Sequence, residues 1–254
     1  MLSTHTLFHK LDGRSVNLVV TVASDAIRAS LFYFETGQVP RVLAHTHQDM
    51  PAHDFLTLDH LHDQLLALLP TLCDDIAKKA QILYEIDDLF KDHQRIHNIT
   101  VLFASPWTEK HVRIKKESYD NYTPITQEIL TALSLVEAPE STTKIDTYTT
   151  SAKVNGYEVG AEYVVGKTAR SLEVSLVDSY VVTEYIESVS QVLETKFNID
   201  KSHIFFKPFS SALFEGTSEL YQVPKDRVLL YMHAQYIDVF VFNNHQMVGY
   251  SSLN

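Results

Sequence analysis

The sequence predicts an α/β protein of two parts, a sheet domain and a smaller α+β unit inserted into it. Strand-like runs near the start are followed by a long stretch of helical periodicity and then a buried strand. After Pro106 the pattern changes to a mixture of short strands and helices that continues to residue 206. From residue 207 onward a helix leads into strand-like runs joined by short turns.

Three strands are expected first, in an antiparallel meander. Residues 16–22, 27–34 and 39–46 are rich in β-branched and aromatic side chains, and short links join them. Residues 99–104 read ITVLFA, a continuous apolar run that suits a buried central strand. The sheet therefore gains a fourth strand beyond the helical stretch.

The helical stretch is expected to form a long amphipathic helix. Asp54 suits the N-cap position, and apolar residues recur at helical spacing from Phe55 to Leu83. Pro70 lies inside this stretch and predicts a kink or a break, because proline removes one hydrogen bond of the helix.

The inserted unit and the region after it contain further expected elements. A polar linker at 137–143 separates two parts of the insert. The expected strands are 111–116, 144–154, 171–180 and 203–206 in the insert, and 227–232, 236–242 and 246–251 after it; the expected insert helices are 125–135 and 182–197.

Composition narrows the function classes. The net charge of −11 repels nucleic acid and anionic lipid, and no cluster of Lys and Arg stands out against it. The single cysteine, Cys73, allows no intramolecular disulfide, which fits a cytoplasmic protein. No apolar run approaches the roughly 20 residues that cross a bilayer. We expect no nucleic-acid partner and at most peripheral membrane association.

Three stretches carry a resemblance to a known family. The first runs from Ile145 to Glu215 and contains the hairpin VNGYEV, the turn GKTAR, the strand LEVSLVD and the helix TEYIESVSQVLETKF. The others are VNLVVTVASDAIRASLF before it and RVLLYMHAQYIDVFVFNNHQMVGYSS after it. Their order and spacing resemble FtsA/PilM-type actin-like ATPases, which contain an inserted SHS2 subdomain.

The resemblance implies a fold and its domains. It implies an actin-like (ribonuclease H-like) sheet domain in residues 1–105 and 207–254, interrupted by an SHS2-like insert at 106–206. It also implies that the second half of the family fold, which binds adenosine, is absent.

The positions that match the family's phosphate loops lack most of the acids and glycines that these loops have in the family. The first loop, Asp-Ile-Gly-x-x-x-(Ile/Val)-(Lys/Arg) in the family, reads TVASDAIR here, so Thr21 replaces the acid and Ala23 the glycine, while Arg28 is retained. The second loop reads YMHAQYID in place of Asp-x-Gly-Gly-Gly-Thr-Thr-Asp. Tyr231 replaces its acid, His233 and the residues Ala234 and Gln235 replace its glycines, and only Asp238 is retained.

Glycine matters in such loops because it lets backbone N–H groups approach a phosphate. The chain has only 7 glycines, and these loops contain none. We therefore expect no cofactor, no catalytic residue and no ATP hydrolysis.

Other candidate chemistry is weaker. His45, His47, His53, His60 and His62 suggest a metal site, but without cysteines or a paired carboxylate motif a solvated strand edge is the better interpretation. The acidic pairs Asp74-Asp75 and Asp87-Asp88 fit solvent-facing helix positions better than catalysis. No metal site is predicted.

The favoured hypothesis is a non-catalytic scaffold that binds a protein partner. Resemblance suggests a role in type IV pilus assembly or cell division at the inner membrane, with the cytoplasmic tail of a membrane assembly protein as partner. Trp107 and Tyr157 are the predicted anchors of a groove between the sheet domain and the insert, because aromatic anchors carry much of the binding energy. The alternatives are a divergent ATPase completed by the missing half, a peptide added to a strand edge, and a self-assembling subunit or homo-oligomer.

Overall fold

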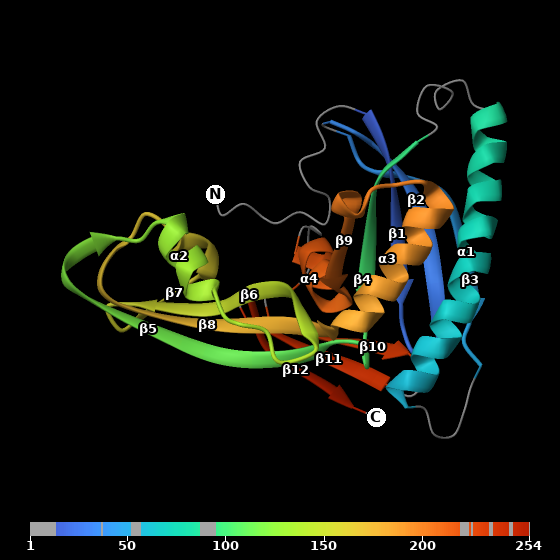
Figure 1. Cartoon of the computed structure of the whole chain (residues 1–254). Helices are drawn as coiled ribbons and strands as arrows, with labels where there is room; N and C mark the ends of the chain where they lie inside the picture. Colours follow the sequence, from blue (N-terminus) through green and yellow to red (C-terminus); the bar gives the residue numbers. More distant parts are fainter. Residues whose placement is uncertain are drawn as a thin grey trace.

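A five-stranded sheet forms the first layer of the structure (Figure 1). This computed structural model describes residues 14–36, 38–51, 57–86, 95–218, 224, 226–233, 236–243 and 246–253. The strand order is β3 (Arg41–Asp49), β2 (Ala26–Glu35), β1 (Arg14–Val22), β4 (Ile96–Phe103) and β9 (Ile204–Pro208). β1, β2 and β3 form the expected antiparallel meander, and β4 and β9 run parallel to β1.

Helices cover both faces of this sheet. α1 (Leu58–Ile86) and α3 (Thr183–Phe197) pack on one face, where the alternate residues of β1 from Val16 to Val22 are fully buried. α4 (Phe209–Ser218) contributes Phe209 and Ala212 to a smaller cluster with Val19 on the other face. Burial on both faces explains why β1 and β4 are continuous apolar runs.

α1 is one continuous helix, so a break at Pro70 is wrong. Five of its leucines and isoleucines at helical spacing are almost completely buried in the core. Burying each such side chain contributes about 1.5–3 kcal/mol, and together these outweigh the cost of about 3 kcal/mol for an interior proline. The expected cap Asp54 lies outside the described residues; instead, the Thr57 hydroxyl accepts a hydrogen bond from the His60 N–H.

The insert is a four-stranded antiparallel sheet with one helix. Its strands, in the order β5 (Glu109–Pro124), β8 (Thr168–Val182), β6 (Thr142–Val154) and β7 (Tyr157–Val159), carry α2 (Gln127–Ser134) on one face. Asn155 and Gly156, both at positive φ, form the two-residue turn between β6 and β7.

The insert ends earlier than the expected boundary at residue 206. β9 pairs with β4, and α3 buries Tyr185, Ile186 and Val189 in the core of the first sheet. The apolar pattern of residues 182–206 predicted the elements correctly but not which sheet they join. The chain therefore returns to the first layer after β8.

The last three strands form a sheet of their own and do not extend the first one. β10 (Arg227–His233), β11 (Tyr236–Asn243) and β12 (Gln246–Leu253) form an antiparallel meander. Phe240 and Phe242 pack with Tyr148 of β6 and Leu213 of α4, so this sheet contacts both the insert and the helix after β9. Figure 1 shows these strands, in red, beneath the sheet of the insert.

Candidate functional site

The first candidate loop is a tight turn between β1 and β2. Ala23 is completely buried, and its N–H donates to the Ala26 carbonyl at 3.1 Å. The Arg28 guanidinium makes two hydrogen bonds to the Asp25 carboxylate, at 2.6 and 3.3 Å. The Asp25 hydrogen bond is the largest cause that raises the pKa of Arg28, and burial opposes it. Asp25 and Arg28 thus form an ion pair with each other.

Thr21 and Arg28 face each other across this hairpin. They are paired in the register of β1 and β2, and both are half-buried. The Thr21 hydroxyl, at the position where the resemblance implies an acid, thus lies opposite the Arg28 cation.

The second candidate loop joins β10 and β11. His233 is the last residue of β10 and pairs in register with Tyr236, while Ala234 and Gln235 lie outside the described residues. Tyr231 is half-buried, and its ring lies 4.4 Å from that of Phe209 in α4. An aromatic side chain in an apolar contact thus occupies the position where the resemblance implies an acid.

Asp238 is the centre of a buried polar cluster. Its Oδ1 accepts hydrogen bonds from the Ser105 hydroxyl at 2.7 Å and the Tyr250 hydroxyl at 2.9 Å, and these two oxygens lie 2.8 Å apart. Asp238 is 3% exposed. Because Ser105 follows β4, whereas Asp238 and Tyr250 belong to β11 and β12, the cluster joins the first sheet to the last one.

Lys110 of β5 covers this cluster. Its amine lies 3.2 Å from the centroid of the Tyr250 ring, a cation–π arrangement. Burial lowers the pKa of Lys110 to about 7, although the charge of Asp238 opposes the shift. Burial also raises the pKa of Tyr250, which therefore stays a neutral hydrogen-bond donor. Through Lys110 the insert thus contacts the place where the first and the last sheet meet.

The two candidate loops meet at one place. Burial raises the pKa of Tyr231, and the charges of Arg28, Asp25 and Asp238 also act on it. The first loop and Ser105 follow the carboxyl ends of the parallel strands β1 and β4, and the Ala104 N–H donates to the Val22 carbonyl at 2.9 Å. The meander of β1, β2 and β3 and the addition of β4 to the same sheet are those expected from the sequence, whereas β9 was expected in the insert. The fold is actin-like.

The described part of the actin-like chain contains no group of His, Cys, Asp and Glu side chains arranged to hold a metal ion. Within the same ranges, no helix is long and apolar enough to cross a membrane. The carboxylates of both loops, Asp25 and Asp238, are engaged by protein donors at short distances.

The two predicted partner-binding residues do not line a common surface. Trp107 is 2% exposed and packs against Phe103 and Tyr185 in the core of the first sheet. The expectation that it anchors an exposed groove is therefore wrong; the large apolar ring fills the space under α3 instead. Tyr157, next to the turn between β6 and β7, is 78% exposed.

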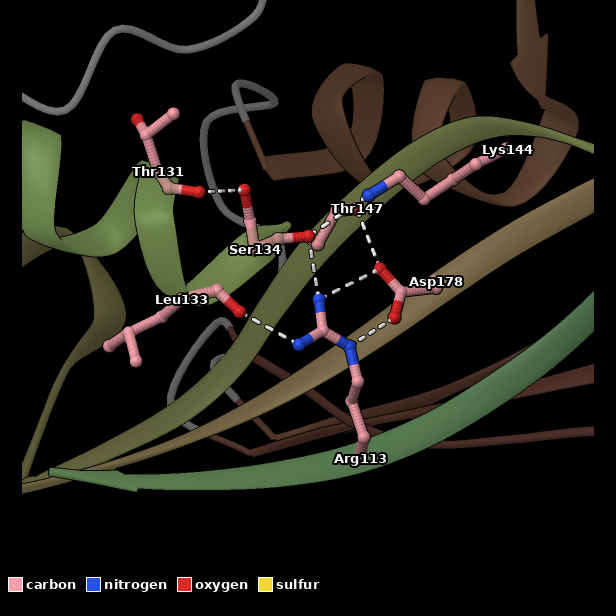
Figure 2. A network of polar contacts seen from close by, with 7 residues as sticks. All are labelled: Arg113, Thr131, Leu133, Ser134, Lys144, Thr147 and Asp178. Carbon is pink, nitrogen blue, oxygen red and sulfur yellow. Dashed lines mark hydrogen bonds and ion pairs between the residues drawn. The ribbon is translucent and has the colours of Figure 1, made fainter. Parts of the chain in front are cut away.

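A second polar cluster lies inside the insert (Figure 2). Arg113 of β5 forms an ion pair with Asp178 of β8, which is completely buried, and donates to the carbonyls of Leu133 and Ser134 at 2.7 Å each. Burial raises the pKa of Asp178, but hydrogen bonds from Arg113 and Thr147 outweigh it and leave the pKa below its usual value. Because these carbonyls end α2, where cations are favourable, the cluster fastens α2 to its sheet.

Sequence reasoning missed that Ser105, Lys110 and Tyr250 meet; Ser105 follows β4, Lys110 lies in β5 and Tyr250 lies in β12. It also missed the pair Arg113 and Asp178. The one signal available was a charged residue, Asp178, inside the mainly apolar run LVDSYVV.

No family model matches the chain, and no curated protein matches it. Among solved structures, one similar chain is a Bacteroides thetaiotaomicron protein with an actin-like ATPase fold and unknown function, at 11% identity and a TM-score of 0.42, covering 94% of this chain and 70% of that one.

Two further similar structures belong to assembly systems. A chain of the PilM-PilN type IV pilus biogenesis complex is 12% identical with a TM-score of 0.49, covering 94% of this chain and 61% of that one. The cytoplasmic domain of EpsL, an inner-membrane component of the type II secretion system of Vibrio cholerae, is 10% identical with a TM-score of 0.38, covering 94% and 71%. The actin-like assignment rests on the sheet order, and these likenesses concern the fold alone.

Proposed function

We propose that this chain is a non-catalytic actin-like scaffold that acts by binding a protein partner. One observation carries the proposal: the Asp238 carboxylate is buried and bound by the hydroxyls of Ser105 and Tyr250. An acid that serves a nucleotide must face it. Here the carboxylate of Asp238 instead joins the first sheet to the last one.

The backbone of the first loop supports the proposal. The described residues of both loops all have φ below zero; within the described chain, positive φ is confined to positions such as Asn155 and Gly156, away from the loops. A phosphate is usually bound by successive N–H groups in a glycine-containing turn. The buried Ala23 side chain occupies space that a glycine would leave open for such an approach.

The proposal also says to which group of actin-like proteins the chain is most similar. The order of meander, helix, strand, insert and second meander supports a PilM/FtsA-like protein with an SHS2-like insert. On this basis we propose a cytoplasmic role in type IV pilus assembly or cell division at the inner membrane. The partner would be the cytoplasmic segment of an inner-membrane assembly protein.

Calorimetric titration with MgATP and MgADP tests the proposal that the chain is not an ATPase. We expect no saturable heat, because neither loop offers a phosphate cradle. The matched control is Asp238→Asn, which removes the one retained acid but keeps the side-chain shape. Stoichiometric MgATP binding by the wild type that is lost in Asp238→Asn, together with release of phosphate, would show a divergent ATPase instead.

A further inference from the structure

The strongly exposed aromatic side chains of the described ranges all belong to the insert. They are Tyr122, Tyr157 and Tyr163, which are 64%, 78% and 65% exposed. The first is in the last part of β5, the second begins β7, and the third ends a short 3-10 helix between β7 and β8. We call these three residues the exposed tyrosines. Tyrosine is enriched in protein–protein interfaces, so their concentration in one unit indicates a surface that makes contacts.

Hydrogen bonds join the segments that carry the exposed tyrosines. The side chain of Asn155, in the turn between β6 and β7, accepts a hydrogen bond from the Arg170 N–H at 2.7 Å. The Ile125 N–H, just after β5, donates to the Lys167 carbonyl, just before β8, at 2.8 Å. Because these turns are tied to one another, a partner that binds there would order little additional backbone.

This end of the insert lies away from the last sheet (Figure 1). The last sheet contacts the insert through Tyr148 of β6 and Lys110 of β5. From Tyr148 to Val154, which pairs with Tyr157, β6 rises about 20 Å at about 3.3 Å per residue. Charges are screened over about 8 Å at physiological salt. The residues beside the tyrosines, and not the net charge of the chain, therefore decide which partner is attracted.

Acidic residues accompany two of the exposed tyrosines. Residues 155–163 read NGYEVGAEY and contain no Lys or Arg. The two acidic residues of this segment are direct neighbours of Tyr157 and Tyr163 in the sequence, and Glu158 is exposed. Local negative charge attracts a cation and repels an anionic lipid surface.

The ring of Tyr122 shows what such a tyrosine can bind. The Arg170 guanidinium carbon lies 4.9 Å from the centroid of this ring, a cation–π contact. Among the residues that the structure describes, the rings of Tyr157 and Tyr163 contact no cation and no other ring. Because both side chains are exposed beside acidic residues, each can take a guanidinium or ammonium group as Tyr122 does.

We propose that Tyr157 and Tyr163 form a docking surface for a segment of a protein partner that carries arginine or lysine side chains. Each ring would bind one cation, and the Glu158 carboxylate would attract it further. This gives the proposed scaffold a surface for its partner, and it rests on that proposal only in taking the partner to be a protein.

Chemical nitration tests whether the two rings are open in the full chain. Tetranitromethane at low dose should nitrate Tyr157 and Tyr163 before buried tyrosines such as Tyr33 and Tyr180, as mapped by mass spectrometry of fragments. Protection of Tyr157 and Tyr163 would show that another part of the same chain covers them, and it would overturn the proposal.

A cationic peptide tests the binding itself. The probe is a peptide of about eight residues in which Arg and Gly alternate, and the reference has citrulline in place of arginine, which keeps the shape without the charge. In the full chain with carbon-13-labelled tyrosine rings, NMR should show saturable shifts of Tyr157 and Tyr163 with the arginine peptide and none with the citrulline peptide.

Substitutions separate the ring from the hydroxyl and from general charge. Tyr157→Leu with Tyr163→Leu should weaken binding at least fivefold, because losing one exposed cation–π contact weakens it about two- to fivefold. Tyr157→Phe with Tyr163→Phe keeps both rings and should leave the affinity within about twofold. Glu158→Gln should weaken binding more than Glu117→Gln, the matched control, which removes the same charge from another exposed residue of the insert.

Several results would contradict this docking surface. Equal shifts with the citrulline peptide, or equal affinity of the Leu and Phe variants, would overturn it. Flotation with phosphatidylglycerol vesicles, or concentration-dependent sedimentation, that only the Leu variant abolishes would assign the tyrosines to lipid or to a second copy and would overturn it as well. Failure here would leave the MgATP titration unaffected, so the two proposals fail separately.

Discussion

Replacing Arg113 by Met should destabilise the insert strongly. The substitution keeps an unbranched apolar stem but removes the guanidinium that lies between Asp178 and the end of α2. Asp178 keeps its hydrogen bond from Thr147 at 2.6 Å, and the Ser134 carbonyl keeps that of Lys144 at 2.9 Å. The Leu133 carbonyl loses its Arg113 donor, and the buried carboxylate loses its counter-ion.

The magnitude follows from the burial of the pair. The Asp178 side chain is 1% exposed and that of Arg113 is 16% exposed, so solvent screens neither well. Removing one partner of a buried pair typically costs about 3–5 kcal/mol. Leaving a carbonyl without its donor costs about 1–3 kcal/mol, but the two effects share one side chain and do not add fully. We expect a loss of about 3–5 kcal/mol.

Urea unfolding measures the loss in the free energy of unfolding, and hydrogen exchange shows which part of the chain is destabilised. Exchange of the α2 amides should accelerate more than that of α1. Lys116→Met is the matched control, because its ion pair with Glu173 is on the surface, where solvent screening leaves it little effect on stability. The reasoning is refuted if Arg113→Met costs no more than Lys116→Met, or if α2 keeps its protection. The contribution of Asp178 should be present above its unfolded pKa and be lost as pH falls below that value, because its folded pKa is lowered.

Three further predictions concern the core and the polar cluster. Tyr250→Phe removes a donor to Asp238 and should lower the free energy of unfolding by about 1–3 kcal/mol in chemical denaturation, whereas an unchanged value would mean that the hydrogen bond contributes nothing. The folded pKa of Lys110 is below its unfolded value, so the wild type should gain stability as pH rises from about 7 toward 10.5, by up to about 1.4 kcal/mol per pH unit. Lys110→Met should abolish this rise in melting temperature, and persistence of the rise would assign it to another group. Trp107→Ala should cost about 3–5 kcal/mol of stability, and a variant that melts like the wild type would show that the ring is not part of the core.

Apolar patterns predicted the elements well, because each pattern reports the burial of its own segment. The runs VNLVVTV and ITVLFA are strands of the first sheet, and the hairpin at Asn155-Gly156 has the expected turn. The same patterns do not report which sheet a strand joins. Residues 203–206 were therefore assigned to the insert, whereas β9 pairs with β4.

The candidate site was predictable only where the resemblance supplied positions. Thr21, Arg28, Tyr231 and Asp238 do lie at two converging turns. Ser105 and Tyr250 could not be found in this way, because they are 145 residues apart and meet only through the packing of two sheets. Neither residue type, alone on its strand, signals a buried hydrogen bond.

The melting temperature in millimolar MgATP tests the central claim most directly. A ligand at 100 times its dissociation constant adds about 2.7 kcal/mol. For a chain of this size that is a rise of about 5–10 °C. The account predicts the same melting temperature with and without MgATP for both the wild type and Asp238→Asn. A rise of several degrees in the wild type that Asp238→Asn loses would contradict it, because Asp238 would then serve a nucleotide and its metal ion.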